Sequence, residues 1–390
     1  MQKRLVRVAN AVLDLEPYES ERRSPNVPSS HSGLLKLDRN ETTTGPAPSV
    51  IESIKDFLNT KPLNWYPDPD ASELKEKIAE YAALPTGYIN CYAGVGLALE
   101  HIFRTYLETG TEVVISGPVS DDIMKSAQST GARVVEIDFE NPFEPKIEEI
   151  VNRITSRTRA VYLKTPNEYT GASFNEAELV FLLAYAERTM IIIDEEFFEF
   201  TGRTMADLTA RFLNLTIIRS FSGAFGLASL KAAYIITDPE NSSFLNRIKG
   251  ENGPDSIAQI AALSALDNID YTREYAVGIN QSKKALTDNL PDIGYNFRMT
   301  SGNFMLLEVS DNAEYIESLD KQGIWVMDLS GMNGLRRFLR ITIGTPEQTD
   351  KLLLTLSRMA ERFATGYNRN RVANAENRIK GEIKKPVSVL

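Results

Sequence analysis

The chain has 390 residues, of which 42% are hydrophobic and 25% charged, and a formal net charge of −10. Such a composition is typical of a folded globular protein with a sizeable core, and the acidic balance argues against nucleic-acid binding, which requires a basic face. The single cysteine, Cys91, excludes an intramolecular disulfide and a multi-thiolate metal site, and with only two histidines in the chain we expect no metal centre.

The N-terminal region does not have the features of a secretory signal. Asp14 and Glu16 lie where such a signal needs an uninterrupted apolar core, and no run of about 18 apolar residues occurs anywhere in the chain. We therefore expect a cytoplasmic protein with no membrane partner.

From about residue 88 to 240, short apolar runs alternate with amphipathic stretches, which predicts an α/β fold with a mainly parallel, seven-stranded sheet. The Val- and Ile-rich runs lack alternation, as in strands buried on both faces. The predicted strands are Tyr88–Tyr92, Glu112–Ser116, Arg133–Phe139, Ala160–Lys164, Met190–Asp194, Leu215–Ser222 and Ala232–Thr237. The predicted helices between them include Leu97–Leu107, Ser120–Thr130 and Asn175–Thr189.

After residue 256 the pattern changes to two longer helices, the second at Thr272–Leu290, and then a new α/β alternation that ends in a helix at Pro346–Phe363. Four parts are expected: an N-terminal arm that joins the small domain (1–45), a large domain (46–270), a small C-terminal α/β domain (271–364) and a basic polar tail (365–390). The tail carries six basic and two acidic residues, which predicts a solvated, frayed end or, alternatively, a docking segment.

Five motifs go beyond the fold pattern. L-D-R-N-E at 37–41, with G-P-A-P at 45–48, precedes Y-P-D-P-D at 66–70. D-E-E-F at 194–197 follows an apolar strand, and R-S-F-S-G-A-F-G-L-A-S-L-K occupies 219–231. F-L-R-I-T-I-G-T at 338–345 contains an arginine inside an apolar strand, and a buried guanidinium needs an anionic partner.

In this order and at these spacings, the motifs resemble those of the pyridoxal-phosphate (PLP) aminotransferases of fold type I, class I/II, and most of all histidinol-phosphate aminotransferase. The resemblance implies a PLP-aminotransferase-like fold and a homodimer. It also implies a role for each matching residue: Asp194 pairs with the cofactor's pyridine nitrogen, Arg340 grips the substrate α-carboxylate, and Asn40 lies over the substrate. The phosphate contacts would come from Ser220, Lys231, the backbone at Gly94 and, across the dimer interface, Tyr66.

Several positions depart from the family pattern around one ligand. Gly223 stands where the family has its Schiff-base lysine, which holds the cofactor and moves the proton. Glu168 replaces an asparagine, and Phe197 a tyrosine, that contact the cofactor's phenolate oxygen. We therefore expect no PLP, with PLP or pyridoxamine phosphate bound only noncovalently if at all.

Two functions remain open. One is a pseudoenzyme that binds a carboxylated, amino-acid-like small molecule through Arg340 in the former active-site cleft. The other is an enzyme that works without PLP or with noncovalent pyridoxamine phosphate, with Glu168 and Tyr66 as catalytic candidates. Each site residue also has a structural alternative: a helix cap for Asp194, a turn residue for Ser220, a solvated side chain for Lys231 and a surface loop acid for Glu168.

Overall fold

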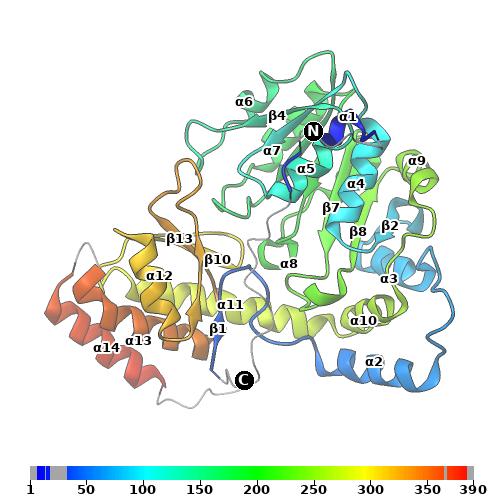
Figure 1. The fold of residues 1–390 in the computed structure, drawn as a ribbon. Coiled ribbons are helices and arrows are strands. Elements are labelled where there is room, and N and C mark those ends of the chain that lie inside the picture. Colours follow the sequence, from blue (N-terminus) through cyan, green and yellow to red (C-terminus); the bar gives the residue numbers. More distant parts are fainter. Residues whose placement is uncertain (1–6, 14, 18–32, 364–366, 384–390) are drawn as a thin grey trace.

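The computed structural model describes residues 7–13, 15–17, 33–363 and 367–383. Its centre is a seven-stranded sheet with the order β2-β8-β7-β6-β5-β3-β4 (Figure 1). β8 runs antiparallel to β2 and β7, and the other neighbouring strands are parallel. The predicted α/β fold with a mainly parallel sheet is confirmed. The strands are β2 (Ile89–Tyr92), β3 (Glu112–Ser116), β4 (Arg133–Ile137), β5 (Thr158–Lys164), β6 (Met190–Asp194), β7 (Leu215–Ser220) and β8 (Ala233–Thr237).

Helices cover both faces of this sheet, because successive strand residues point to opposite sides and both sides are apolar. One face packs against α2 (Pro48–Thr60), α3 (Ser72–Ala82), α6 (Ile147–Val151), α7 (Glu176–Tyr185) and α10 (Ser256–Asp267). The other packs against α4 (Val95–Tyr106), α5 (Asp121–Gln128) and α9 (Pro239–Lys249). Shorter elements are α1 (Asn10–Leu13), α8 (Phe198–Thr201), η1 (Thr86–Tyr88), η2 (Ala206–Ala210) and η3 (Ala228–Leu230).

The C-terminal part forms a separate antiparallel sheet with the order β12-β13-β10-β9 and its own apolar core (Figure 1). Its strands are β9 (Phe297–Met299), β10 (Phe304–Glu308), β12 (Met327–Asp328) and β13 (Phe338–Thr342), and its helices are α11 (Ile269–Asn289), α12 (Asn312–Asp320) and α13 (Pro346–Phe363). The N-terminal β1 (Leu35–Lys36) pairs in parallel with β11 (Ile324–Trp325), so the segment before α2 lies against this small unit.

Five of the seven predicted central strands differ at one end from the observed strands by one or two residues. β7 ends at Ser220, because the Ser220 hydroxyl accepts a hydrogen bond from the backbone N–H of Ser222 at 2.9 Å and the chain turns there. The apolar run at 323–329 divides into β11 and β12, because one half pairs with β1 and the other with β13. No helix in the described ranges is both long and apolar enough to cross a membrane.

The expectation of a solvated tail is wrong for residues 369–383, which form α14 (Arg369–Ile383) beside α13 (Figure 1). Val372, Ala375 and Ile379 are buried in the small unit's core. Their spacing places them on one face of a helix. Arg378 adds contacts to Asn289 and Asp292 in the 289–292 segment.

We predict that Ile379→Ala lowers the free energy of unfolding by about 2–4 kcal/mol, because it opens a cavity in a packed core. Urea denaturation measures the change, with Asn374→Ala, at an exposed position of the same helix, as the control. Equal stability of the two variants would show that α14 does not contribute to the core.

Candidate functional site

The candidate site begins at the carboxyl ends of the adjacent parallel strands β5 and β6. Lys164 and Asp194 are the last residues of these strands, and the register places them directly opposite each other. Both side chains are buried, with exposed fractions of 7% and 2%. Ligands gather at this edge in open α/β sheets, because the loops that follow the strands converge there.

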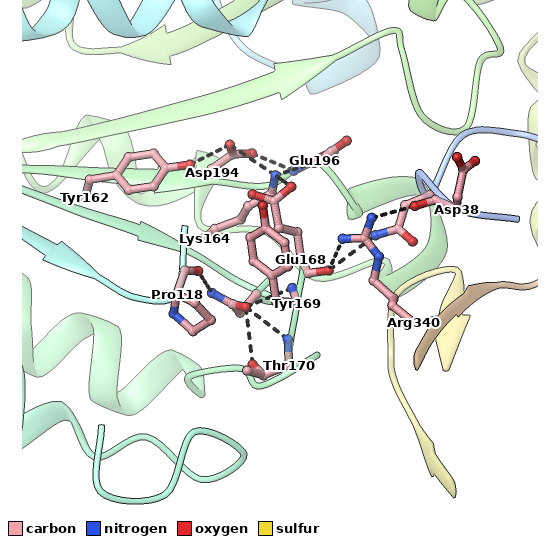
Figure 2. Close-up of polar contacts among 12 residues, drawn as sticks. Asp38, Pro118, Tyr162, Lys164, Glu168, Tyr169, Thr170, Asp194, Glu196 and Arg340 are labelled. Atoms are coloured by element: carbon pink, nitrogen blue, oxygen red, sulfur yellow. Dashed lines mark hydrogen bonds and ion pairs between the residues drawn. The ribbon is translucent and has the colours of Figure 1, made fainter. Parts of the chain in front are cut away.

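Lys164 is surrounded by three carboxylates, and we call these four residues the Lys164 cluster (Figure 2). The ammonium nitrogen lies 3.2 Å from Glu168 Oε2 and 3.9 Å from Asp194 Oδ2, and it forms a close ion pair with Glu196. Glu168 comes from the loop after β5, and Glu196 follows β6. Their side chains keep exposed fractions of 19% and 25%, so the cluster borders on solvent.

The cluster changes the proton affinities of its members. Burial alone would lower the pKa of Lys164, but the neighbouring carboxylates of Glu168, Glu196 and Asp194 raise it well above its ordinary value. Lys164 is therefore a fixed ammonium ion and not a free amine. Burial raises the pKa of Asp194 to about 6, although the Lys164 charge opposes the shift.

Both oxygens of Asp194 already have hydrogen-bond donors. The Tyr162 hydroxyl donates to Oδ2 at 2.9 Å, and the backbone N–H of Glu196 donates to Oδ1 at 3.0 Å (Figure 2). The Asp194 carboxylate is therefore held by a side chain of β5 and by the turn after β6, as well as by the charge of Lys164.

Arg340, on β13, is held on the other side of Glu168. Its Nη1 donates to the main-chain oxygen of Glu168 and its Nη2 to that of Asp38, each at 2.9 Å (Figure 2). The residue is 4% exposed, yet its Nε has no partner, and no carboxylate of the described residues forms an ion pair with it. Burial lowers the pKa of Arg340. A buried guanidinium with unused donors is suited to an anion.

Asn40 lies beside this arginine, in the left-handed backbone region at φ 56°. Its side-chain amide approaches the same main-chain oxygen of Glu168 at 3.4 Å, and its backbone N–H donates to the hydroxyl of Thr342 at 2.9 Å. The two predicted substrate-binding residues, Asn40 and Arg340, therefore come together at one point.

Three of the four predicted phosphate contacts, Gly94, Ser220 and Lys231, lie at the edge where β2, β7 and β8 meet. Gly94 precedes α4 at φ 95°, and a Cβ on it would lie 3.3 Å from Lys231 Cβ. Ser220 is the last residue of β7 and pairs with Ala233 on β8. Because Ala233 is two residues after Lys231, Ser220 lies near the same end of β8 as Lys231. Tyr66 does not join them within the chain, because its side chain is 91% exposed in the loop between α2 and α3.

The sequence motifs did not single out Lys164, because none of them includes the end of β5. The only signal in the sequence was its place at the end of a predicted buried strand; that this strand lies beside the one ending in Asp194 is seen only in the structure. Glu195, next to Asp194 in the chain, has a structural role: it is buried and bonded to Arg219, Thr204 and the backbone N–H of Met205.

The residues present do not suit PLP. A protonated cofactor ring bound to Asp194 would have to share that carboxylate with Tyr162 and with the Lys164 ammonium, which lies 3.9 Å from Asp194 Oδ2 and has the same charge as the ring. Position 223, assigned by the resemblance to the Schiff-base lysine, is glycine, and a Cβ there would lie 3.6 Å from the main-chain oxygen of Glu196. Phe197 presents a buried ring packed on Phe304 and offers no hydroxyl.

No group of three or more His, Cys, Asp or Glu residues is arranged to hold a metal ion in the ranges that the structure describes. The three carboxylates of the Lys164 cluster are turned toward an ammonium ion. Cys91 is a buried free thiol.

The family model for aminotransferases of class I and II matches residues 32–356. The chain belongs to this aminotransferase family. A dihydroxyacetone phosphate transaminase of Campylobacter jejuni is 33% identical over 326 residues, which cover 82% of this chain and 88% of the relative. A histidinol-phosphate aminotransferase of Methanothermobacter thermautotrophicus is 27% identical over 371 residues, 92% of this chain and 98% of the relative.

Solved aminotransferases share the fold. The histidinol-phosphate aminotransferase of Clostridium acetobutylicum superposes with a TM-score of 0.76 at 23% identity, covering 84% of this chain and 99% of that one. The enzyme of Sinorhizobium meliloti, solved in complex with pyridoxal-5′-phosphate, gives 0.74 at 24% identity, covering 84% and 91%. At this identity the likeness establishes the fold alone.

We predict that Lys164→Met lowers the free energy of unfolding by about 3–5 kcal/mol near neutral pH, because three carboxylates lose their one cation. The loss should shrink as the pH falls toward 5. Burial raises the pKa of Asp194 in the folded protein to about 6, above its ordinary value of 3.8. As the pH falls, this carboxyl is protonated and loses its unfavourable buried charge. Folding then becomes more favourable, and the missing lysine costs less stability.

Thermal melting between pH 5 and 8 measures both effects. Lys55→Met, on the exposed face of α2, is the matched control, since its ion pair with Glu52 is solvated. A stability loss in Lys164→Met that is independent of pH would contradict the charge explanation.

Proposed function

We propose that this aminotransferase-family chain binds a small, amino-acid-like carboxylate at Arg340 and does so without PLP. The protein would then be a ligand-binding pseudoenzyme that keeps the family's fold. The relatives named above are transaminases, and transamination is the activity that we expect this chain to lack.

The proposal is supported mainly by the burial of Arg340 and by its unused hydrogen-bond donors. Its guanidinium is buried and bonded to two neutral carbonyl oxygens, and its Nε is unpaired. The bonds that it makes leave three of its five N–H groups for a ligand. A carboxylate is the best complement, because its two oxygens match the planar fork of the guanidinium.

Position 223 and the Lys164 cluster both oppose PLP binding. Glycine has no amine to hold the cofactor, and Lys164 cannot replace it while three carboxylates keep it protonated. The same cluster also opposes noncovalent pyridoxamine phosphate, because a charged ring would compete with Lys164 for Asp194.

A cofactor-free enzyme is the second candidate, and one observation favours it. Asp194 combines burial with a pKa of about 6 and lies close to Lys164 and Glu168. Perturbed carboxyls of this kind are found at catalytic sites but also in structural ion-pair networks. Turnover of a bound ligand, followed by mass spectrometry, distinguishes the two candidates.

We predict that Arg340→Gln weakens carboxylate binding by about 2–5 kcal/mol, the range for removing one partner of a desolvated charge pair. Calorimetry with L-alanine, propanoate and pyruvate measures the loss, and inorganic phosphate as competitor tests whether the site instead prefers phosphate. Arg336→Gln, at an exposed position just before β13, is the control. Equal affinities of wild type and Arg340→Gln would refute the assignment.

Absorption spectra with added PLP test the cofactor part of the proposal separately. We expect the spectrum of free PLP with wild type and also with Gly223→Lys, because Lys164 still engages Asp194, the residue that the family resemblance assigns to the ring nitrogen. A new visible band in Gly223→Lys alone would show that the pocket is still built for the cofactor.

We also propose a homodimer, supported by the loop between α2 and α3. Leu63, Trp65 and Tyr66 are 65%, 72% and 91% exposed there, and neighbouring apolar side chains of this size on a surface mark an interface. The family resemblance places Tyr66 in the neighbouring subunit's site.

We predict a mass near twice 43.5 kDa by light scattering at micromolar concentration, and a shift toward the monomer in Trp65→Ser. Phe181→Ser, at another exposed aromatic on α7, should leave the mass unchanged. A monomeric wild type would rule out the dimer.

A further inference from the structure

The Lys164 cluster has an excess of negative charge. Three carboxylates, Glu168, Asp194 and Glu196, share the single ammonium of Lys164, and among the described residues none of the three forms an ion pair with any other cation. With the acids ionised, the formal charge of the cluster is therefore −2, in surroundings where two of its members are almost fully buried. Such a group of acids is stabilised by one more positive charge.

The unmatched negative charge has a definite location. Asp194 has a donor on each oxygen, and Glu196 is closely paired with Lys164. Glu168 offers only Oε2 to Lys164, and its Oε1 is buried without a partner. An unpaired carboxylate oxygen away from water is costly, so this atom is where an additional donor would bind.

The residue with the unpaired acceptor contacts the residue with the unpaired donor through its main chain. The main-chain oxygen of Glu168 is bonded to Arg340 Nη1 at 2.9 Å, so the two residues are in direct contact (Figure 2). Arg340 itself is almost fully buried, and its Nε lacks a partner. A guanidinium that needs an anion and a carboxylate that needs a cation thus adjoin each other in one site.

We infer that Glu168 Oε1 is a cation subsite that binds the ammonium group of a zwitterionic ligand whose carboxylate lies on Arg340. The inference rests on the proposed function, because it takes the carboxylate on Arg340 as given. It assigns the second contact to Glu168, in the Lys164 cluster. A metal ion fits less well, since the described acids are not arranged around a common metal position and an ammonium already lies among them.

If this subsite exists, a ligand needs an amine in order to bind tightly. A charge-assisted hydrogen bond to a buried carboxylate corresponds to roughly a 10- to 100-fold gain in affinity. Acids that carry the same carboxylate but no amine should therefore bind more weakly by about that factor. Oxo acids should bind as weakly as simple acids, because a carbonyl oxygen placed against Glu168 Oε1 would repel it.

Calorimetry on the full chain at pH 7.5 tests the inference with matched probes. L-alanine, β-alanine and 4-aminobutanoate vary the distance between ammonium and carboxylate, and propanoate, butanoate and pyruvate lack the amine. We expect at least one amino acid to bind ten times or more tightly than its amine-free partner. Glu168→Gln should remove this preference but retain binding of the simple acids, and Glu148→Gln, at an exposed position on α6, should change neither.

The outcomes separate the two proposals. If propanoate binds as tightly as every amino acid, or if Glu168→Gln keeps the preference, the cation subsite is refuted and carboxylate binding at Arg340 stands. If no probe binds to wild type, both proposals fail. The ligand series in wild type decides the inference even if Glu168→Gln does not fold.

Discussion

The buried ion pairing of Lys164 is the interaction on which the site depends. An ammonium ion at the end of a central strand is stable only with carboxylates around it, and the chain supplies them from the opposing strand end, the following loop and the following turn. Loss of any one partner changes the charge felt by the others. Glu168 and Glu196 both pair with this one lysine at the carboxyl end of β5.

A second constraint joins the two halves of the molecule. Arg340 belongs to the small antiparallel sheet, yet its guanidinium reaches the loop after β5 of the large sheet and the segment after β1. The result is a separation of charge, with acids at the ends of β5 and β6 and a cation at β13. Either half alone would present an ordinary buried charge, and only the assembled fold sets them side by side.

The sequence predicted those features that local pattern determines. The central strands appear at their predicted places because their Val and Ile runs are buried on both faces, and Asn40 meets Arg340 because both belong to motifs of a known family. It did not predict the Lys164 cluster, because contacts between neighbouring strands depend on sheet order, which no local pattern encodes. It also missed α14, whose core contacts come from Val372, Ala375 and Ile379 in an otherwise polar segment.

The way in which Arg340 is anchored bears on how the site can evolve. Its two hydrogen-bond acceptors are main-chain oxygens, of Asp38 and Glu168, and every amino acid supplies such an oxygen. Replacement of the side chain at position 168 would leave the arginine's anchor in place. Descendants of this chain could therefore exchange the group that faces the ligand, and with it the molecule recognised, and still keep the arginine positioned for a carboxylate.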